Sequence, residues 1–419
     1  MKKSDLIWAI CDIDEDLLRL TEEEPVMTKK HTRPLRIVLI AAVIAVLLAG
    51  TVLAYAIRHW DELFVSAFQV DNSDKELLDS AFQDVYAQTT QDGVTCTVTQ
   101  LLGTEHCLVA ALELKLPENL ETGTTSAEEL KTLTADNDLP WQSDEDAVSA
   151  SQMLSHYFGY DPTWTDFPDA PYAEFISLAP VTMEKADLLA KLDKEYTSTE
   201  YTKDIPEELQ KDSLVNRILF DQASKELGTG EDGWNDYGIE FIKCSYDPET
   251  HTLTELLCFN SSLSLPGRSY TLVIPQLYFQ SMKTFFSPDN LLGSAGQSLL
   301  TSPMVLHFTA DYQPQKQSFY NILQNGTTIG SLELSPVSAH LTFPQEPDDP
   351  NRLAPNRHDY LKNNSDLRIR MADGKEIKLR ERSSGFADDQ FAFYLADDII
   401  DLTQVQEVCL GSYTLTLAQ

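Results

Sequence analysis

The sequence predicts a mainly β protein, α+β overall, in which one transmembrane helix precedes two extracytoplasmic β-sandwich-like domains, the first with a helical insertion. Three observations predict this. Residues 37–57 are apolar without a single formal charge, many later segments alternate apolar and polar residues between turn pairs, and a polar block between them has apolar residues at helical spacing. A chain of 419 residues is long enough for two or three domains.

The charge of the chain is strongly negative. Its 66 acidic and 31 basic residues give a net charge of -35. Residues 1–36 carry seven basic and eight acidic residues, net -1, so -34 lies on residues 58–419. Such a field repels phosphate backbones, so we expect no nucleic-acid partner. The acidity is typical of an exposed soluble domain, and the alternative is a face that attracts calcium or other cations.

The apolar run at 37–57 is long enough to cross a bilayer. As a helix it rises about 31 Å, against a hydrocarbon core of about 30 Å. Its end, Ala54-Tyr55-Ala56, is spaced like a signal-peptidase site, so a cleaved leader is the alternative. A leader has a short basic head, whereas 36 residues come first here, with the acidic run Glu22 to Glu24. The prediction is therefore a retained anchor.

Basic residues set the orientation of this anchor. Basic side chains near a span remain on the cytoplasmic side. Residues 1–36 are therefore expected to form a cytoplasmic tail, and the bulk of the chain is expected to be extracytoplasmic. The protein is then a single-pass protein of the cell membrane. Five basic residues lie within 20 positions before the run and two lie after it: Arg19, Lys29, Lys30, Arg33 and Arg36, against Arg58 and Lys75.

The first outer domain is expected at residues 58–310. A capping box at Ser73 to Glu76 and apolar spacing up to Tyr86 predict an amphipathic helix. After the Asp92-Gly93 turn, the alternation changes to a period of two and predicts two half-buried strands, ending at Thr99 and at Leu116, with a hairpin around Gly103. Further strands are expected at 239–246, 252–259, 270–274 and 304–309.

Residues 118–229 form the expected helical insertion. Ser126 begins a second capping box, and helices are predicted at Met183–Tyr196 and at Pro206–Leu227, where Gly228 provides a stop. The polar stretch 311–317 marks a boundary.

The second outer domain is expected at residues 318–419. Asn325-Gly326 and Asp373-Gly374 predict hairpin turns. Alternating strands are predicted at 367–371, 391–395 and 413–417, with a proline-rich loop from Pro344 to Asp359. Many short antiparallel strands favour β-sandwiches.

Five of the six cysteines lie in the outer part, and they have two interpretations. Cys96 with Cys107, and Cys244 with Cys258, flank proposed turns and could form bridges, or all are reduced and buried. No catalytic motif is present, and the carboxylates from Asp12 to Glu23 lack the glycine of a calcium loop. We therefore expect no enzyme activity, no cofactor, no metal site and no catalytic residue.

The tail contains one stripe of large apolar residues. Leu6, Ile10, Ile13, Leu17 and Leu20 share one face of a helix. The stripe could bind the surface of the inner leaflet, the tail of a second copy of the chain, or a groove on a cytoplasmic protein. The acidic side chains around it disfavour the anionic leaflet and favour a basic groove. The alternative is a disordered tail.

Two segments carry a family resemblance. The tail segment Cys11 to Leu18 and the outer strand Asp92 to Gln100 resemble Gram-positive membrane proteins of the domain-of-unknown-function family numbered 4179. The insertion 118–229 departs from that family, and the His and Cys spacing of zinc-binding anti-sigma domains is absent.

The resemblance implies an anti-sigma-factor-like regulator. Its tail would tether an extracytoplasmic-function sigma factor, and its outer part would respond to an unknown extracytoplasmic ligand. The alternative is a cell-surface binding or adhesion module with an inert tail. The acidic residues Asp14 and Asp16 are expected to face a basic rim on the sigma factor. The expected apolar contacts with the sigma factor are Leu6, Ile7, Ile10, Ile13, Leu17 and Leu18.

Overall fold

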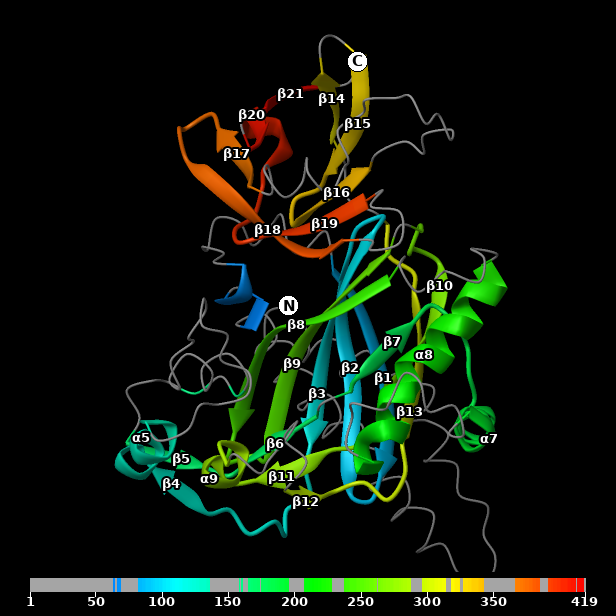
Figure 1. Cartoon of the computed structure of the whole chain (residues 1–419), viewed down its shortest axis with the longest axis vertical. Helices are drawn as coiled ribbons and strands as arrows, with labels where there is room; N and C mark the ends of the chain where they lie inside the picture. Colours follow the sequence, from blue (N-terminus) through cyan, green and yellow to red (C-terminus); the bar gives the residue numbers. More distant parts are fainter. Residues whose placement is uncertain are drawn as a thin grey trace, which may run out of the picture. The chain divides into compact units, whose positions relative to one another are not determined.

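The computed structural model describes part of one compact unit, residues 56–419. The described residues are 63–64, 66–68, 82–135, 158, 160, 165–173, 175–195, 207–227, 237–261, 263–287, 296–313, 318–324, 327–342, 366–384, 391–411 and 413–417. They form a mainly β protein, as predicted (Figure 1). No helix in this part of the chain combines the length and apolar character needed to cross a bilayer. The predicted span at 37–57 and the whole tail lie outside the described residues.

The first β region centres on a five-stranded antiparallel sheet of order β1-β2-β3-β9-β8. The Asp92-Gly93 turn joins β1 to β2, and both residues have positive φ, 53° and 83°, as a tight hairpin turn requires. The predicted hairpin around Gly103 is confirmed, since β2 and β3 pair antiparallel. The strands are β1 (Phe82–Gln91), β2 (Val94–Gly103), β3 (Cys107–Lys115), β8 (Tyr237–Asp247) and β9 (Thr252–Ser261).

The amphipathic helix predicted up to Tyr86 is wrong at its end, because residues from Phe82 onwards belong to β1. A β-bulge explains the misreading. Between Asp84 and Ala87 the register against β2 shifts, and Tyr86 has a φ of 54°. The extra residue moves the apolar positions from a spacing of two towards a spacing of three, which imitates a helix.

The central strands β3 and β9 of the five-stranded sheet are buried on both faces along most of their length, whereas the strands at 94–99 and 108–116 were expected to be half-buried. In β3, Leu108, Ala110, Leu112 and Leu114 belong to the main core, while Val109 and its same-face neighbours belong to a smaller cluster on the other side. The main core is shared with a three-stranded sheet of order β13-β10-β7. Its strands are β7 (Ser177–Ala179), β10 (Arg268–Ile274) and β13 (Met304–Ala310).

Among the described residues, three helices lie between β3 and β8 in the sequence, where the helical insertion was expected. Ser126 caps α5, accepting a hydrogen bond from the Glu129 amide at 3.2 Å. Helix α8 packs against β7 and α7 (Figure 1). The helices are α5 (Ala127–Ala135), α7 (Lys185–Glu195) and α8 (Glu207–Leu227). The short elements around them are β4 (Thr124–Ser126), β5 (Asp166–Pro168), β6 (Ala170–Tyr172), β11 (Tyr278–Gln280), β12 (Gln297–Ser298) and α9 (Met282–Phe285).

The second β region is a closed eight-stranded barrel of order β14-β15-β16-β19-β18-β17-β20-β21, drawn yellow to red in Figure 1. Both predicted hairpins are present, with β14 pairing β15 and β17 pairing β18. A sandwich was expected here, and the difference is the pairing of β14 with β21, which closes the sheet on itself. The strands are β14 (Ser318–Gln324), β15 (Thr327–Leu334), β16 (Ser338–Thr342), β17 (Leu367–Met371), β18 (Glu376–Ser384), β19 (Phe391–Ala396), β20 (Val405–Leu410) and β21 (Tyr413–Leu417), with the short helix η3 (Leu402–Gln404) before β20.

Candidate functional site

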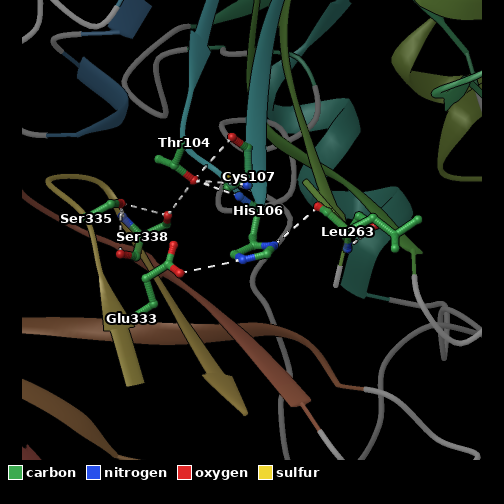
Figure 2. A network of polar contacts seen from close by, with 8 residues as sticks. Thr104, His106, Cys107, Leu263, Glu333, Ser335 and Ser338 are labelled. Atoms are coloured by element: carbon green, nitrogen blue, oxygen red, sulfur yellow. Dashed lines mark hydrogen bonds and ion pairs between the residues drawn. The ribbon is translucent and has the colours of Figure 1, made fainter. Parts of the chain in front are cut away.

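The loop between β2 and β3 contacts the turn between β15 and β16, which makes it one of the places where the sheet meets the barrel. We call the contacts of residues 103–107 with the barrel and with Tyr312 the joint. Thr104 organises the loop, because its hydroxyl accepts a hydrogen bond from the Cys107 amide at 3.0 Å and its own amide donates to the Cys107 carbonyl at 2.7 Å. The same hydroxyl lies 3.5 Å from the Ser338 hydroxyl of the barrel (Figure 2).

His106 makes the charged contact of the joint. Its Nε2 lies 3.6 Å from a carboxylate oxygen of Glu333, and its Nδ1 lies 3.2 Å from the Leu263 carbonyl oxygen (Figure 2). Burial lowers the pKa of His106, but Glu333, the Leu263 carbonyl and the charge of Glu105 outweigh burial, so the net pKa is raised. Both ring nitrogens face acceptors, an arrangement that suits a protonated, doubly donating ring.

A second imidazole extends this contact into the barrel. His340 lies opposite Glu333 in the β15–β16 ladder, and its ring is 4.2 Å from that of His106 between centroids. On its other side it stacks on Phe393 at 4.7 Å with an interplanar angle of 7°. The His106 ring therefore contacts a carboxylate of β15 and, through His340, an aromatic stack of the barrel.

Tyr312 ties the chain that leads into the barrel to the sheet. It belongs to the stretch 311–317 that the sequence marked as a polar boundary, yet its side chain is buried in the main core. Its hydroxyl donates a hydrogen bond to the Thr104 carbonyl at 2.8 Å. Its ring lies against Gly103, so the loop is fixed on one side by Tyr312 and on the other by Glu333 and Ser338.

An apolar cluster surrounds the polar contacts. It contains side chains from the second face of β2, β3 and β9, aromatic side chains that precede β1, and three barrel residues. Burial of apolar surface contributes about 25 cal/mol per Å², so this cluster supplies attraction while the polar contacts set position and charge. Its buried members are Leu63, Phe64, Phe68, Leu102, Cys107, Val109, Ala111, Leu256, Cys258, Val337, Leu395 and Ile399.

The joint holds two parts of the chain together, and the raised pKa of His106 makes its charge depend on pH. Ser335 and Ser338 hydrogen-bond each other at 2.9 Å within their turn. Activating a serine requires a base within hydrogen-bond reach, and both nitrogens of His106 already face other acceptors. The arrangement therefore fits a titratable contact between the sheet and the barrel better than a nucleophile and its base.

A hollow of about 190 Å³ lies on the barrel and is lined by Asp373, Lys375 and Asp401 among others. Its carboxylates serve local structure, since Asp373 accepts from the Lys375 amide at 2.8 Å and Asp401 caps η3. No group of three or more His, Cys, Asp or Glu side chains in the described ranges is arranged to hold a metal ion.

The structure leaves the predicted partner residues untested. All eight tail residues, from Leu6 to Leu18, lie outside the described part of the chain. The resembling segment Asp92 to Gln100 lies in the β1–β2 hairpin. His106, Glu333 and His340 were not predicted from the sequence. The local signal was a histidine three residues after a hairpin glycine, and Glu333 and His340 lie more than 200 residues later in the chain.

Comparisons with known proteins give no family. No family model matches the chain, and no curated protein matches it. One solved structure, described as "The crystal structure of the conserved domain protein from Bacillus anthracis", is similar with a TM-score of 0.31 and 8% identity, over 80% of this chain and 77% of that chain. A likeness of this size says nothing about function.

Proposed function

We propose that the protein is a membrane-anchored signal-transducing regulator that tethers an extracytoplasmic-function sigma factor through its cytoplasmic tail. The observation that carries the proposal is the uncharged run at 37–57, which has five basic residues before it and almost all of the net negative charge after it. Such a chain has one short segment on the cytoplasmic side and a large acidic part outside.

The tail supplies the binding surface in this proposal. Its apolar stripe cannot be buried within 36 residues, because so short a segment has no core of its own. Acidic side chains next to the stripe match a partner with a basic rim around an apolar groove. The contacts are those named above, Leu6, Ile7, Ile10, Ile13, Leu17 and Leu18 in the groove, with Asp14 and Asp16 at the rim.

The joint gives the outer part a means of responding. The sheet and the barrel meet through a histidine–carboxylate contact and an apolar cluster, and both can be shifted by a ligand or by pH. A change at the joint would alter the outer part and release the tethered partner. This step assigns the sensing element to residues 103–107, Tyr312, Glu333 and Ser338.

Two measurements test the proposal with the full-length protein in membranes. Protease added to intact cells should remove the outer part and leave the tail protected. A photo-crosslinker at Ile10 or Leu17 should capture a sigma factor. Ile13→Asp should abolish capture, whereas Ser4→Asp, on the opposite helix face, should leave it unchanged. Capture of no sigma factor, or equal loss with both variants, would contradict the proposal.

A surface binding module is the second candidate, and one observation favours it. Phe319 and Leu323 on β14 are 50% and 40% exposed, and Leu417 on β21 is 57% exposed. Large exposed apolar side chains on neighbouring strands are typical of contact surfaces. If this candidate holds, Phe319→Ser should abolish the cellular phenotype while deletion of residues 2–28 leaves it intact, and the tethering proposal predicts that the deletion abolishes it.

A further inference from the structure

Two cysteines from distant parts of the sequence meet on the face of the sheet that carries the joint. The sulfurs of Cys107 in β3 and Cys258 in β9 lie 3.6 Å apart. Both side chains are buried, with 2% and 1% of their surface exposed. We propose that Cys107 and Cys258 form a reversible disulfide that changes the joint, which would make the pair a modification site. This inference does not depend on the proposed tethering of a sigma factor.

The topology selects this pair over the pairs that the sequence suggested. Cys96 and Cys244 belong to the main core, whereas Cys107 and Cys258 belong to the cluster on the opposite face of the sheet. A bridge between Cys96 and Cys107, or between Cys244 and Cys258, would therefore pass through the sheet. Cys96 and Cys244 share a face, but β3 and β9 separate their strands, a gap of about 14 Å, which is far beyond a disulfide.

The register gives the disulfide its effect on structure. Cys107 pairs with Asn260 and Cys258 pairs with Val109, so the two cysteines are diagonal neighbours rather than direct partners. The bond length of about 2.05 Å requires the sulfurs to approach by roughly 1.5 Å, and diagonal positions are farther apart than a relaxed bridge prefers. Oxidation must therefore shift β3 against β9, and a strained bridge of this kind is readily reduced.

Cys107 transmits that shift directly to the joint. Its amide donates to the Thr104 hydroxyl and its carbonyl accepts from the Thr104 amide, so it forms one end of the loop that contacts the barrel. Both cysteines also pack in the same cluster as Val337, Leu395 and Ile399 of the barrel. A movement of Cys107 therefore moves Thr104 and His106 relative to Ser338 and Glu333.

The reaction needs an oxidant, and a small-molecule or protein disulfide supplies it. One cysteine of the pair loses its proton and attacks the oxidant disulfide, which forms a mixed disulfide and releases one thiolate. The second cysteine, also deprotonated, attacks the mixed disulfide, which forms the Cys107–Cys258 bond and releases the second thiolate. The two protons pass to the released thiolates, so the oxidant ends as two thiols.

The cover over the pair controls access. Phe64 and Phe68, stacked with centroids 6.3 Å apart, belong to the cluster that buries both sulfurs. Attack requires this cover to open, so oxidation should be slow in the native protein. Phe64→Ala removes part of the cover and should accelerate oxidation several-fold, whereas Phe158→Ala, which opens the main core instead, should not.

The test oxidises the full-length protein in detergent with oxidised glutathione, blocks remaining thiols with an alkylating agent and maps linked peptides without reductant. We expect a linked peptide pair containing Cys107 and Cys258, reversed by dithiothreitol, in the wild type and in Cys96→Ala and Cys244→Ala. Cys107→Ala and Cys258→Ala should each abolish it. Linkage of another pair, or persistence of both thiols in the Phe64→Ala protein, would overturn the proposal.

A second measurement tests the effect on the joint and needs no cysteine variant. Hydrogen exchange of the wild type should change on oxidation in segments 103–107 and 335–338, and should remain unchanged in helix α8, which packs on β7 and α7. Equal exchange at the joint in the reduced and oxidised proteins would overturn the coupling between the disulfide and the barrel contact.

Discussion

The ring of Tyr312 occupies the space that a side chain on Gly103 would need. A Cβ built on Gly103 would lie 2.0 Å from Cζ of Tyr312, well inside the closest approach of two carbon atoms. The strand β2 therefore ends on a glycine because the chain leading into the barrel crosses it there. This contact fixes Tyr312 on the sheet and, through its hydroxyl, fixes the Thr104 loop.

Gly103→Ala should destabilise the protein strongly. The added methyl group meets a buried ring that core packing prevents from moving freely, and we expect a loss of about 3 kcal/mol or more in the free energy of unfolding. Tyr312→Phe removes only the hydrogen bond to Thr104 and should cost about 1 kcal/mol. Urea unfolding of the two variants gives the comparison.

A double variant makes the prediction specific. In Gly103→Ala with Tyr312→Ala, the methyl group enters the space that the ring has left, so the pair should lose clearly less than the sum of the two single losses. Strictly additive losses would show that the ring and the glycine are not coupled in this way.

Glu255 should make the protein less stable as the pH rises. Its side chain faces the main core, its Oε2 has no hydrogen-bond partner, and burial raises its pKa from 4.5 to about 8. A raised folded-state pKa gives stability that is fully present below pH 4.5 and is lost as the pH rises to about 8, on the order of a few kcal/mol. Glu255→Gln should match the wild type at pH 4 and exceed it at pH 8.

An exposed carboxylate is the control for this titration. Glu121→Gln should leave the pH dependence of the unfolding free energy unchanged. A wild-type curve as flat as that of Glu255→Gln between pH 5 and pH 8 would contradict the assignment.

The sequence predicted local structure well and distant pairing poorly. The turn at Asp92-Gly93 was readable because two positive φ angles demand those residue types. The bulge at Tyr86 could not be predicted, because the local sequence does not indicate which residue lacks a cross-strand partner. The same limit applies to β3. Its second apolar face, with Val109, is covered by side chains that precede β1 and by barrel residues from far along the chain.

The joint could not be predicted for the same reason. His106, Glu333 and His340 are ordinary polar residues in their local sequences, and only the contact between the sheet and the barrel gives them a common environment. Cys107 and Cys258 were recognised as cysteines of an outer domain, but hairpin neighbours were the only pairs that local reasoning could suggest. Barrel closure between β14 and β21 is likewise a pairing of the first and last strands of its region.

Asp92 should stabilise the hairpin turn in two ways, by adopting a positive φ and by accepting hydrogen bonds from Thr301 with its carboxylate. Its Oδ2 accepts hydrogen bonds from the amide and the hydroxyl of Thr301, both at 2.8 Å, and these bonds lower the pKa of Asp92. Asn adopts positive φ and keeps an oxygen acceptor, whereas Ala offers neither. Exchange at the Thr301 amide should therefore rise slightly in Asp92→Asn and strongly in Asp92→Ala.

The pH dependence of this contact has the opposite sign to that of Glu255. A lowered folded-state pKa gives stabilisation that is present above the unfolded value of about 3.9 and is lost as the pH falls through the folded value. Asp373→Ala, in a second Asp-Gly turn, is the matched control and should leave exchange at the Thr301 amide unchanged. Faster exchange in Asp373→Ala than in Asp92→Ala would refute a local role for Asp92.

His106 should make the joint tighter at acidic than at alkaline pH. Its raised pKa means that its contribution is fully present below the unfolded value of about 6.5 and is lost as the pH rises through the folded value. Among the described residues, Glu105, Glu333 and His340 are the other titratable groups at this ring, and of these only Glu333 lies within ion-pair range of it. Exchange in the 103–107 loop should therefore be better protected, after correction for intrinsic rates, at pH 6 than at pH 8.

The ionisation of Glu255 destabilises the protein over the same pH range. The measurement is therefore made in the Glu255→Gln variant, where the remaining pH dependence of loop exchange comes from the joint. There, His106→Asn should lose about 1 to 2 kcal/mol at pH 6 and much less at pH 8. Glu333→Gln should remove the pH difference at the loop, because the charge that holds the proton on His106 is gone. Glu376→Gln, an exposed barrel carboxylate paired with Arg368, should preserve that difference. Equal protection of the loop at both pH values in the parent protein would mean that His106 is neutral in the folded state, and the carboxylate would then be acting as a simple acceptor rather than as a counter-charge.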